Sequence, residues 1–448
     1  MTARLSPAAL ESLPADVARP AYDRSAAGAG VVHLGIGAFH RAHQAVVFDD
    51  LLAAGDPRWM VRAASLRSPD VRDQLAPQDG LYTLVERDGA GERLRVIGAV
   101  REVLVAPEDA AALVEALAAA HLVTLTVTEK GYHLDPASGA LREDEPEIVA
   151  EAAGGIPTTA PGFLVAALAL RRERGLAPFT ALSCDNLPAN GRRLEAAVLA
   201  LAGRRDPALS DWIARHGAFP VSMVDRIVPA TTAADIDALQ ARTRLRDEAM
   251  VKAEPFTQWV IEDRFAGERP DFAAAGVQLT VDVAPWEEAK LRLLNGAHSA
   301  LAYLGALAGH ETMDAVIAQP AFAAFAERLW DEAAATLRPP PGLDLAAYRR
   351  ALAGRFANPA LAHRTRQIAM DGSQKLPQRL LASIAARLGQ GQSIDALALA
   401  VAGWMRWQAG RDEAGRTFVV DDPLAARTFG PAQSPDPAEA VDGLLALD

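Results

Sequence analysis

Two patterns of hydrophobic and polar positions alternate along the first part of the chain. Short apolar runs, typical of buried strands, are separated by stretches in which apolar residues recur at helical spacing, such as AVVFDDLLAAG at 45–55. Strands that alternate with helices predict an α/β fold with a mainly parallel, doubly wound, Rossmann-like sheet. The runs that predict its strands are VVHLGIG (31–37), WMVRAASL (59–66), LVTLTVT (122–128) and FTALSCD (179–185).

Two further β-rich runs, 80–88 and 94–106, differ from this pattern because only a short glycine-containing turn separates them. A connection of that length suits antiparallel strands. The sequence therefore predicts an antiparallel hairpin inserted into the sheet.

The pattern becomes helical after VQLTVDV (277–283), beginning at Pro285. Clusters of proline and glycine at 338–342 and 430–437 predict loops between these helices. We expect a Rossmann dinucleotide-binding domain at 1–283 and an α-helical domain carrying substrate and catalytic residues at 284–448.

Composition and charge narrow the functional class. A net charge of −12 over 448 residues argues against a nucleic-acid partner. The single cysteine, Cys184, fits a reducing compartment, and no leader or membrane-length apolar run is evident, so we expect a cytoplasmic protein without a membrane contact. Only four of the 45 basic Lys and Arg residues are lysines: Lys130, Lys252, Lys290 and Lys375. Because arginine stays protonated whereas lysine can lose its proton, Lys290 is a candidate titrating group.

The first chemical motif is the glycine turn that follows the first strand. Gly35 and Gly37 would let the backbone approach a pyrophosphate, and the next helix would direct its N–H groups toward it. The third glycine of G-x-G-x-x-G is replaced by His40, so an ordinary tight turn is the alternative. Arg41 could pair with a phosphate or be a solvated surface residue, and Phe39 is a further candidate cofactor contact.

The end of the second strand bears on the choice of cofactor. An acid at this point ordinarily bonds the adenosine ribose and selects NAD. Here Arg67 stands near that position and Asp70 follows a little later. NAD is the expected cofactor and NADP is not excluded, although Arg67 is as readily read as a solvated loop residue.

KLRLLNGAHS (290–299) places three polar side chains in an otherwise apolar helix. At about 100° per residue, Lys290, His298 and Asn295 fall near 0°, 80° and 140°, so one side of a helix can present all three. Unpaired, each would cost a few kcal/mol in apolar surroundings. A structural hydrogen-bond network, a snorkelling lysine and a helix irregularity at Asn295 are the alternatives to a shared site.

SCDNLPANG (183–191) follows the strand at 179–185. Open α/β sheets bind ligands at the carboxyl ends of their strands, so Asp185 and Asn186 are expected to face a cleft. An Asx turn leading into the next helix is the alternative. Cys184 reads as a small buried hydrophobe.

Six motifs together resemble the mannitol dehydrogenase family of polyol-specific long-chain dehydrogenases. The resemblance covers residues 31–378 in order and is nearest to the fructuronate reductase (D-mannonate oxidoreductase) branch, with AVAGWMRW further on. The motifs are GIGAFHRAHQ, TVTEKGYH, SCDNLPANG, MVDRIVPATT, KLRLLNGAHS and QIAMDGSQKLPQR.

The resemblance implies a monomeric oxidoreductase that uses a nicotinamide cofactor and no metal. It implies that Lys290 is the general base, that Asn186 and Asn295 hold the oxygen on which charge develops, and that His298 orients the substrate. It further implies that substrate contacts come from Asp225, Arg366 and Lys375, and that Glu129 borders the nicotinamide and relays a proton.

Physical chemistry is consistent with these roles. A lysine has an ordinary pKa of about 10.4, and lowering it by about two units needs roughly 3 kcal/mol of bias against the charged form. Burial and the positive nicotinamide both act in that direction. Two amide donors would stabilise a developing alkoxide.

The expected reaction interconverts a ketose or ketouronate with its polyol or aldonate. A guanidinium in the pocket would match a carboxylate, which favours D-fructuronate and D-mannonate over neutral sugars; a loop salt bridge is the alternative for Arg366 and Lys375. Three other functions stay open: a mannitol 2-dehydrogenase or D-arabinitol dehydrogenase, a dehydrogenase of the mannitol-1-phosphate type, and a non-catalytic dinucleotide-binding redox sensor.

Overall fold

The computed structural model describes residues 3–89, 91–135 and 138–446. They divide into two compact units, Met1–Val283 and Ala284–Asp448. Each unit has its own hydrophobic core.

The first unit is built on a five-stranded sheet in which every pairing is parallel. The prediction of a doubly wound, Rossmann-like domain is confirmed. In spatial order the strands are β6 (Val100–Val105), β3 (Val61–Ser65), β2 (Val31–Leu34), β7 (Leu122–Leu125) and β8 (Thr180–Ser183).

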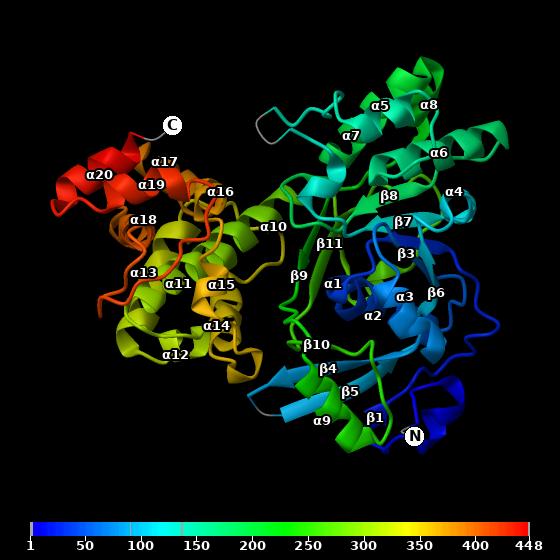
Figure 1. Cartoon of the computed structure of the whole chain (residues 1–448), viewed down its shortest axis with the longest axis horizontal. Coiled ribbons are helices and arrows are strands. Elements are labelled where there is room, and N and C mark those ends of the chain that lie inside the picture. Colours follow the sequence, from blue (N-terminus) through cyan, green and yellow to red (C-terminus); the bar gives the residue numbers. More distant parts are fainter. Residues whose placement is uncertain (1–2, 90, 136–137, 447–448) are drawn as a thin grey trace. The chain divides into compact units, whose positions relative to one another are not determined.

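Helices cover both faces of this sheet (Figure 1). On β2, Val31 joins the core that includes Phe48 and Leu51, whereas Val32 and Leu34 join the opposite core. The strand is therefore buried on both sides, as parallel strands require. The helices of this unit are α1 (Ala38–Ala42), α2 (Gln44–Ala53), α3 (Asp70–Leu75), α4 (Ala110–Ala119), α5 (Pro146–Ala152), α6 (Ala160–Glu173), α7 (Asn190–Arg205), α8 (Pro207–His216) and α9 (Ala233–Thr243), with short 3₁₀ turns η1 (Pro7–Ser12), η2 (Ala76–Gln78), η3 (Glu129–Tyr132) and η4 (Phe272–Ala275).

The predicted hairpin exists but does not lie in the parallel sheet. Strands β4 (Tyr82–Asp88) and β5 (Gly91–Ile97) pair antiparallel within a separate sheet of order β1-β5-β4-β10, where β1 is Val17–Ala18 and β10 is Val251–Ala253. The second predicted run breaks at Gly98, whose N–H donates to Asp49 at 2.8 Å, and continues as β6 in the parallel sheet. A Cβ at Gly98 would come within 2.7 Å of the Pro20 side chain, so a larger residue at this change of sheets would force its neighbours to shift.

A three-stranded sheet completes this unit. Its order is β12 (Gln278–Thr280), β11 (Gln258–Glu262) and β9 (Ser222–Asp225), and β9 pairs antiparallel with β11. Asp225, the last residue of β9, stands opposite Gln258 in this register.

The second unit is helical throughout its described residues, as predicted, and its core includes Leu293, Tyr303, Trp330 and Leu397. The second predicted loop, 430–437, begins inside a helix, because α19 includes Pro431. The helices are α10 (Ala284–Ala289), α11 (Gly296–Leu307), α12 (Met313–Ile317), α13 (Pro320–Ala334), α14 (Leu345–Phe356), α15 (Thr365–Ile368), α16 (Gly372–Leu376), α17 (Ala382–Leu388), α18 (Asp395–Trp407), α19 (Ala425–Ala432) and α20 (Pro437–Leu445), with the 3₁₀ turn η6 (Pro359–Leu361) and the π-helical segments η5 (Lys290–Asn295) and η7 (Pro377–Leu381).

The segment Lys290–Asn295 departs from the predicted continuous α-helix. It is π-helical and lies between α10 and α11. A π-helix has more residues per turn than an α-helix, so the uniform step of about 100° does not hold across this segment. The helix irregularity considered at Asn295 is therefore present.

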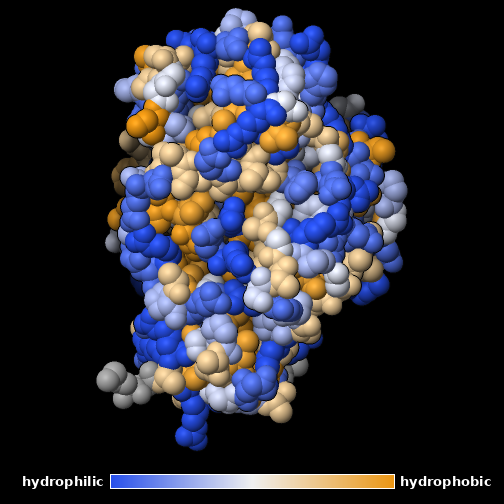
Figure 2. All heavy atoms as spheres, turned by 90° about the vertical axis from the view of Figure 1, so that its right-hand side faces the viewer, coloured by the Kyte–Doolittle hydropathy of each residue, from blue (hydrophilic) through white to orange (hydrophobic). Residues whose placement is uncertain are grey.

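The surface is mixed in character. Figure 2 shows a face on which hydrophilic side chains are interspersed with smaller hydrophobic areas, as on many globular proteins. Within the described residues, no helix is long and apolar enough to cross a membrane.

Candidate functional site

One candidate site lies in the first unit, where the strand order of the parallel sheet reverses. In chain order the five strands run 3-2-1-4-5 across the sheet, so the reversal falls between the neighbouring strands β2 and β7. Ligands of open α/β sheets bind beyond the carboxyl ends of the strands at such a point. The segments that leave there are the glycine turn after β2 and residues 126–129 after β7.

The glycine turn fits a dinucleotide phosphate. Gly35 has φ +94°, and a Cβ on it would lie 2.2 Å from the carbonyl oxygen of Thr126, so only glycine suits this position. Gly37 is the N-cap of α1, and within the described residues no side chain caps this helix. The N–H groups of its first turn are thus left for another acceptor, which suits a bound anion.

Two predicted cofactor contacts beside this turn have other neighbours in the structure. Arg41 is only 7% exposed, which contradicts a solvated surface residue, and its guanidinium donates to the carbonyl oxygen of Ala249. Desolvation lowers its pKa from the ordinary value. Phe39 is half-buried and stacks on His43 with 5.1 Å between ring centroids. The phosphate contact of Arg41 stays a prediction. Its hydrogen bond to Ala249 connects α1 to the loop before β10.

Two exposed residues follow the two strands that flank β2 in the same sheet. Arg67 lies directly after β3, and Glu129 begins η3 after β7. Thr128 precedes Glu129 with φ +66°, an uncommon backbone conformation for threonine. Both predicted residues are thus on the side of the sheet where the glycine turn lies.

Asp185 and Asn186 follow β8 but differ in their exposure to solvent. Asp185 is 8% exposed, and its carboxylate accepts from the backbone N–H groups of Val127 and Thr128 and from the hydroxyl of Tyr132 at 2.7–3.1 Å. The prediction that Asp185 faces a cleft is wrong, because these donors hold it inside. Asn186 is exposed.

Asp225, which is predicted to contact the substrate, is buried at the end of β9, where it is 4% exposed.

A second candidate site is the π-helical segment of the helical unit. Lys290 is its first residue and is 7% exposed, and Asn295 is its last. Among the described residues, Asn295 Oδ1 and His298 Nε2 are buried without a hydrogen-bond partner. Native proteins rarely leave such atoms unsatisfied, so a ligand or water is expected to meet them.

Cationic side chains surround His298. Its ring stacks on Phe356, with 5.3 Å between centroids, and meets His363 edge to face at 4.8 Å. Burial first, and then the neighbouring His363 and the positive charges of Arg379, Arg355 and Lys375, place the pKa of His298 well below its ordinary value. His298 is therefore neutral, and the surrounding charges favour an anion.

Lys375 and Arg379 supply two of these charges from α16 and η7. Lys375 Nζ donates to the carbonyl oxygen of Met370 at 2.6 Å and lies 3.7 Å from the Asp371 carboxylate. Arg379 donates to Ser299 Oγ at 2.9 Å, and within the described residues no carboxylate pairs with it. Burial lowers the pKa of Arg379 to about 10 and also lowers that of Lys375.

Gly296 lets the two π-helical segments approach one another. A Cβ at this position would lie 2.8 Å from the carbonyl oxygen of Arg379. The backbone of η7 therefore passes directly over the start of α11, which fixes the position from which the Arg379 side chain extends.

Unlike Lys375 and Arg379, Arg366 is not among the charges that lower the pKa of His298. It lines a cavity of about 290 Å³ with Arg364 and Arg416, and its guanidinium lies over the Phe418 ring at 5.1 Å. Its contact with the substrate stays a prediction, and Arg379 is a further cation near Lys375.

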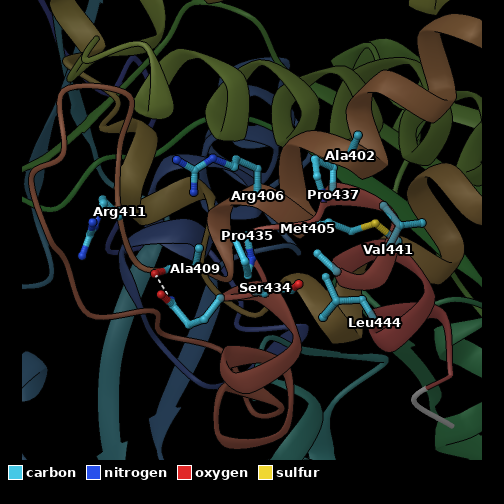
Figure 3. A pocket seen from close by; sticks show the side chains of 13 residues that line it. Ala402, Met405, Arg406, Ala409, Arg411, Ser434, Pro435, Pro437, Val441 and Leu444 are labelled. Carbon is cyan, nitrogen blue, oxygen red and sulfur yellow. Dashed lines mark hydrogen bonds between the residues drawn. The ribbon is translucent and has the colours of Figure 1, made fainter.

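Another cavity of the helical unit, of about 480 Å³, lies among α18, α19 and α20 (Figure 3). Met405, Val441 and Leu444 extend toward this space, and Arg406 and Arg411 are among the residues that line it. No predicted site residue is among those described as lining it.

Sequence reasoning missed His363 and Arg379. Arg379 stands in the quoted motif QIAMDGSQKLPQR, four residues after Lys375, so helical spacing could have indicated it. His363 lies outside every motif and was not foreseeable from spacing. Within the described residues, no group of three or more His, Cys, Asp and Glu side chains could hold a metal ion.

Comparisons with known proteins agree with this architecture. Residues 29–274 match the model of the mannitol dehydrogenase Rossmann domain, and residues 282–447 match that of the mannitol dehydrogenase C-terminal domain. The chain is an oxidoreductase that acts on CH–OH groups, and it belongs to the mannitol dehydrogenase family.

Relatives and solved structures are similar over nearly the whole chain. An Escherichia coli protein called uncharacterized oxidoreductase YeiQ is 47% identical over 97% of this chain and 90% of its own length. The D-mannonate oxidoreductase of Escherichia coli is 45% identical over 96% and 90%. The Pseudomonas fluorescens mannitol 2-dehydrogenase, solved with NAD and D-mannitol, is 39% identical over 99% of this chain and 92% of that chain, with a TM-score of 0.87.

Proposed function

We propose that the protein is an NAD-dependent oxidoreductase that interconverts D-fructuronate with D-mannonate. The observation that carries the choice of substrate is Arg379, a half-buried guanidinium without a carboxylate partner among the described residues, beside the neutral His298 and the cation Lys375. A sugar carboxylate would satisfy that charge, and a planar guanidinium matches it in geometry.

The cofactor assignment rests on the Rossmann unit. The mannitol 2-dehydrogenase relative was solved with NAD. In this chain Gly35 and Gly37 would accommodate the pyrophosphate at the start of α1, with Phe39, Arg67 and Glu129 as further contacts. NAD, when bound, exchanges a hydride with the substrate carbon. The exposed guanidinium of Arg67 leaves room for NADP as a second cofactor.

Proton transfer is assigned to Lys290. In the oxidation of the aldonate, Lys290 takes the hydroxyl proton; in the reverse direction it returns a proton to the carbonyl oxygen. Asn186 and Asn295 donate to that oxygen, and His298 orients the substrate together with Asp225 and Lys375. Supporting this, Lys290 is buried in a polar segment of an otherwise apolar helix, and π-helical turns occur often at functional sites.

Initial rates test the substrate. D-fructuronate, D-fructose and the ketose partner of D-arabinitol would each be measured with NADH and with NADPH. We expect the highest kcat/KM for D-fructuronate with NADH. Higher kcat/KM for D-fructose would reverse the substrate assignment in favour of mannitol 2-dehydrogenase, the activity named for a structure of TM-score 0.87. NADH binding without turnover on any of the three would favour the redox sensor.

We also propose that the protein acts in the cytoplasm as a monomer. The single cysteine in 448 residues supports a reducing compartment.

A further inference from the structure

The third glycine position of the dinucleotide motif is occupied by a fully buried histidine. His40 is 0% exposed in α1, and its ring stacks on that of His33 in β2, with 3.4 Å between centroids and an interplanar angle of 14°. The third glycine of the motif ordinarily permits close packing of helix on strand. Here two imidazole rings fill that space.

Hydrogen bonds fix the orientation of His33. The Thr126 hydroxyl donates to the carbonyl oxygen of Gly35 at 2.8 Å, so its oxygen is left to accept from His33 Nε2–H at 2.9 Å. His33 Nδ1 then accepts from the hydroxyl of Thr124 at 2.8 Å. This tautomer also directs Nε2–H toward the Gly35 carbonyl at 3.2 Å.

The Gly35 carbonyl is the point on which these groups converge. Besides Thr126 and His33, the N–H of Gly37 donates to it at 2.7 Å. Gly35 has φ +94°, a backbone conformation that glycine adopts readily but does not need to keep. The hydrogen bonds to its carbonyl oxygen hold the turn in this conformation. Through the contact of His33 with this oxygen, the stacked pair is joined to the turn that precedes α1.

Beside the stack, a chain of hydrogen bonds runs from Gln44 to the three-stranded sheet. Both ring nitrogens of His40, and Oε1 of Gln44 at the start of α2, are buried without hydrogen-bond partners among the described residues. The Gln44 amide donates to His43 Nδ1 at 3.1 Å, and His43 Nε2–H donates to the carbonyl oxygen of Gln258 at 2.9 Å. Gln258 stands opposite Asp225 in β9.

We propose that His40 and His33 are positioning residues for the dinucleotide. Their stack replaces the third glycine and holds the Gly35–Gly37 turn in the conformation that receives the pyrophosphate. The proposal rests on the proposed function in one respect, that the turn binds NAD. The pair acts through the turn and does not itself touch the reacting atoms.

The test measures NADH affinity by fluorescence titration, separately from turnover. We expect His40→Ala to raise the Kd for NADH about tenfold or more, with kcat at saturating NADH within about threefold of the parent. His40→Phe keeps an aromatic ring on His33 and is expected to restore the Kd to within about threefold. His216→Ala, on α8, is the matched control and leaves both values unchanged.

Thr126→Val provides a second route if His40→Ala does not fold. It removes the hydroxyl that joins His33 to Gly35 while keeping the side-chain shape, so the Kd is expected to rise as well. An unchanged Kd in the folded member of these two variants overturns the proposal. Failure of the parent itself to bind NADH or NADPH would instead overturn the proposed function.

Discussion

Arg379 is the residue that most narrows the choice of substrate. A cation held half-buried without a carboxylate partner is unfavourable unless an anion arrives, and its lowered pKa of about 10 expresses that cost. An anionic substrate would remove the penalty when it binds. A neutral polyol would leave it in place.

Replacing Arg379 should therefore discriminate between acidic and neutral sugars. We expect Arg379→Gln to lower kcat/KM for D-fructuronate about tenfold to a hundredfold, the range for loss of a charge-assisted hydrogen bond of roughly 1.5–3 kcal/mol. With D-fructose the loss should stay under about threefold. Arg328→Gln, which changes an exposed arginine of α13, is the matched control. Equal losses on both sugars would argue against a carboxylate contact.

At this scale the sequence could single out polar residues but could not predict their surroundings. Lys290, Asn295 and His298 could be named because polar residues stand out in an apolar helix. The inward direction of Asp185 depends on backbone N–H groups of a different loop, and the position of Arg379 depends on where η7 passes over α11. Neither follows from spacing along one element.

At the scale of elements, the two π-helical segments determine the shape of the candidate site in the helical unit. They meet at Gly296, where a Cβ would lie 2.8 Å from the Arg379 carbonyl oxygen. The sequence predicted a helix here because its apolar residues recur at nearly helical spacing. The additional residue per turn that makes the segment π-helical changes this spacing too little to be recognised.

Gly296→Ala should accordingly disturb both stability and activity. The added methyl group forces η7 away from α11, so we expect a loss of roughly 1–3 kcal/mol in the free energy of unfolding and a lower kcat. Gly354→Ala in α14 is the control: its added Cβ meets nothing within 4 Å, and Ala in a helix stabilises by about 0.5–1 kcal/mol over Gly. Thermal unfolding and initial rates measure the two effects. A Gly296→Ala variant as stable and active as the parent would contradict this packing.

At the scale of the molecule, buried neutral histidines link stability to pH. Burial lowers the pKa of His33 to about 3 and those of His40 and His298 well below the ordinary value. Unfolding restores a pKa of about 6.5, so the unfolded chain binds protons that the folded chain does not. Stability is therefore full above about pH 6.5 and falls as pH decreases toward the folded-state values, by about 1.4 kcal/mol per pH unit for each histidine.

Thermal unfolding between pH 7 and pH 5 checks this linkage. The melting temperature should decrease over that range in the parent. It should decrease less in His298→Gln, which lacks one of the three groups and so isolates its contribution from those of the carboxylates. Identical pH dependence in the two proteins would show that His298 is not held neutral in the folded state.

The fold class itself could be predicted from the sequence, because alternating strands and helices constrain a parallel sheet strongly. The place of the hairpin could not, since nothing local in residues 80–106 tells which sheet each strand joins; the approach of Pro20 and Asp49 to Gly98 decides it. Contacts between residues far apart in the sequence thus determine which sheet each of these strands joins.

The central claim is that Lys290 moves the proton while the carbon exchanges hydride. Single-turnover rates and NADH affinity of Lys290→Ala test it most directly. We expect the Kd for NADH to stay within about twofold and the rate to fall by about a hundredfold or more, the usual contribution of a general base. Turnover near that of the parent, with cofactor binding intact, would contradict the claim.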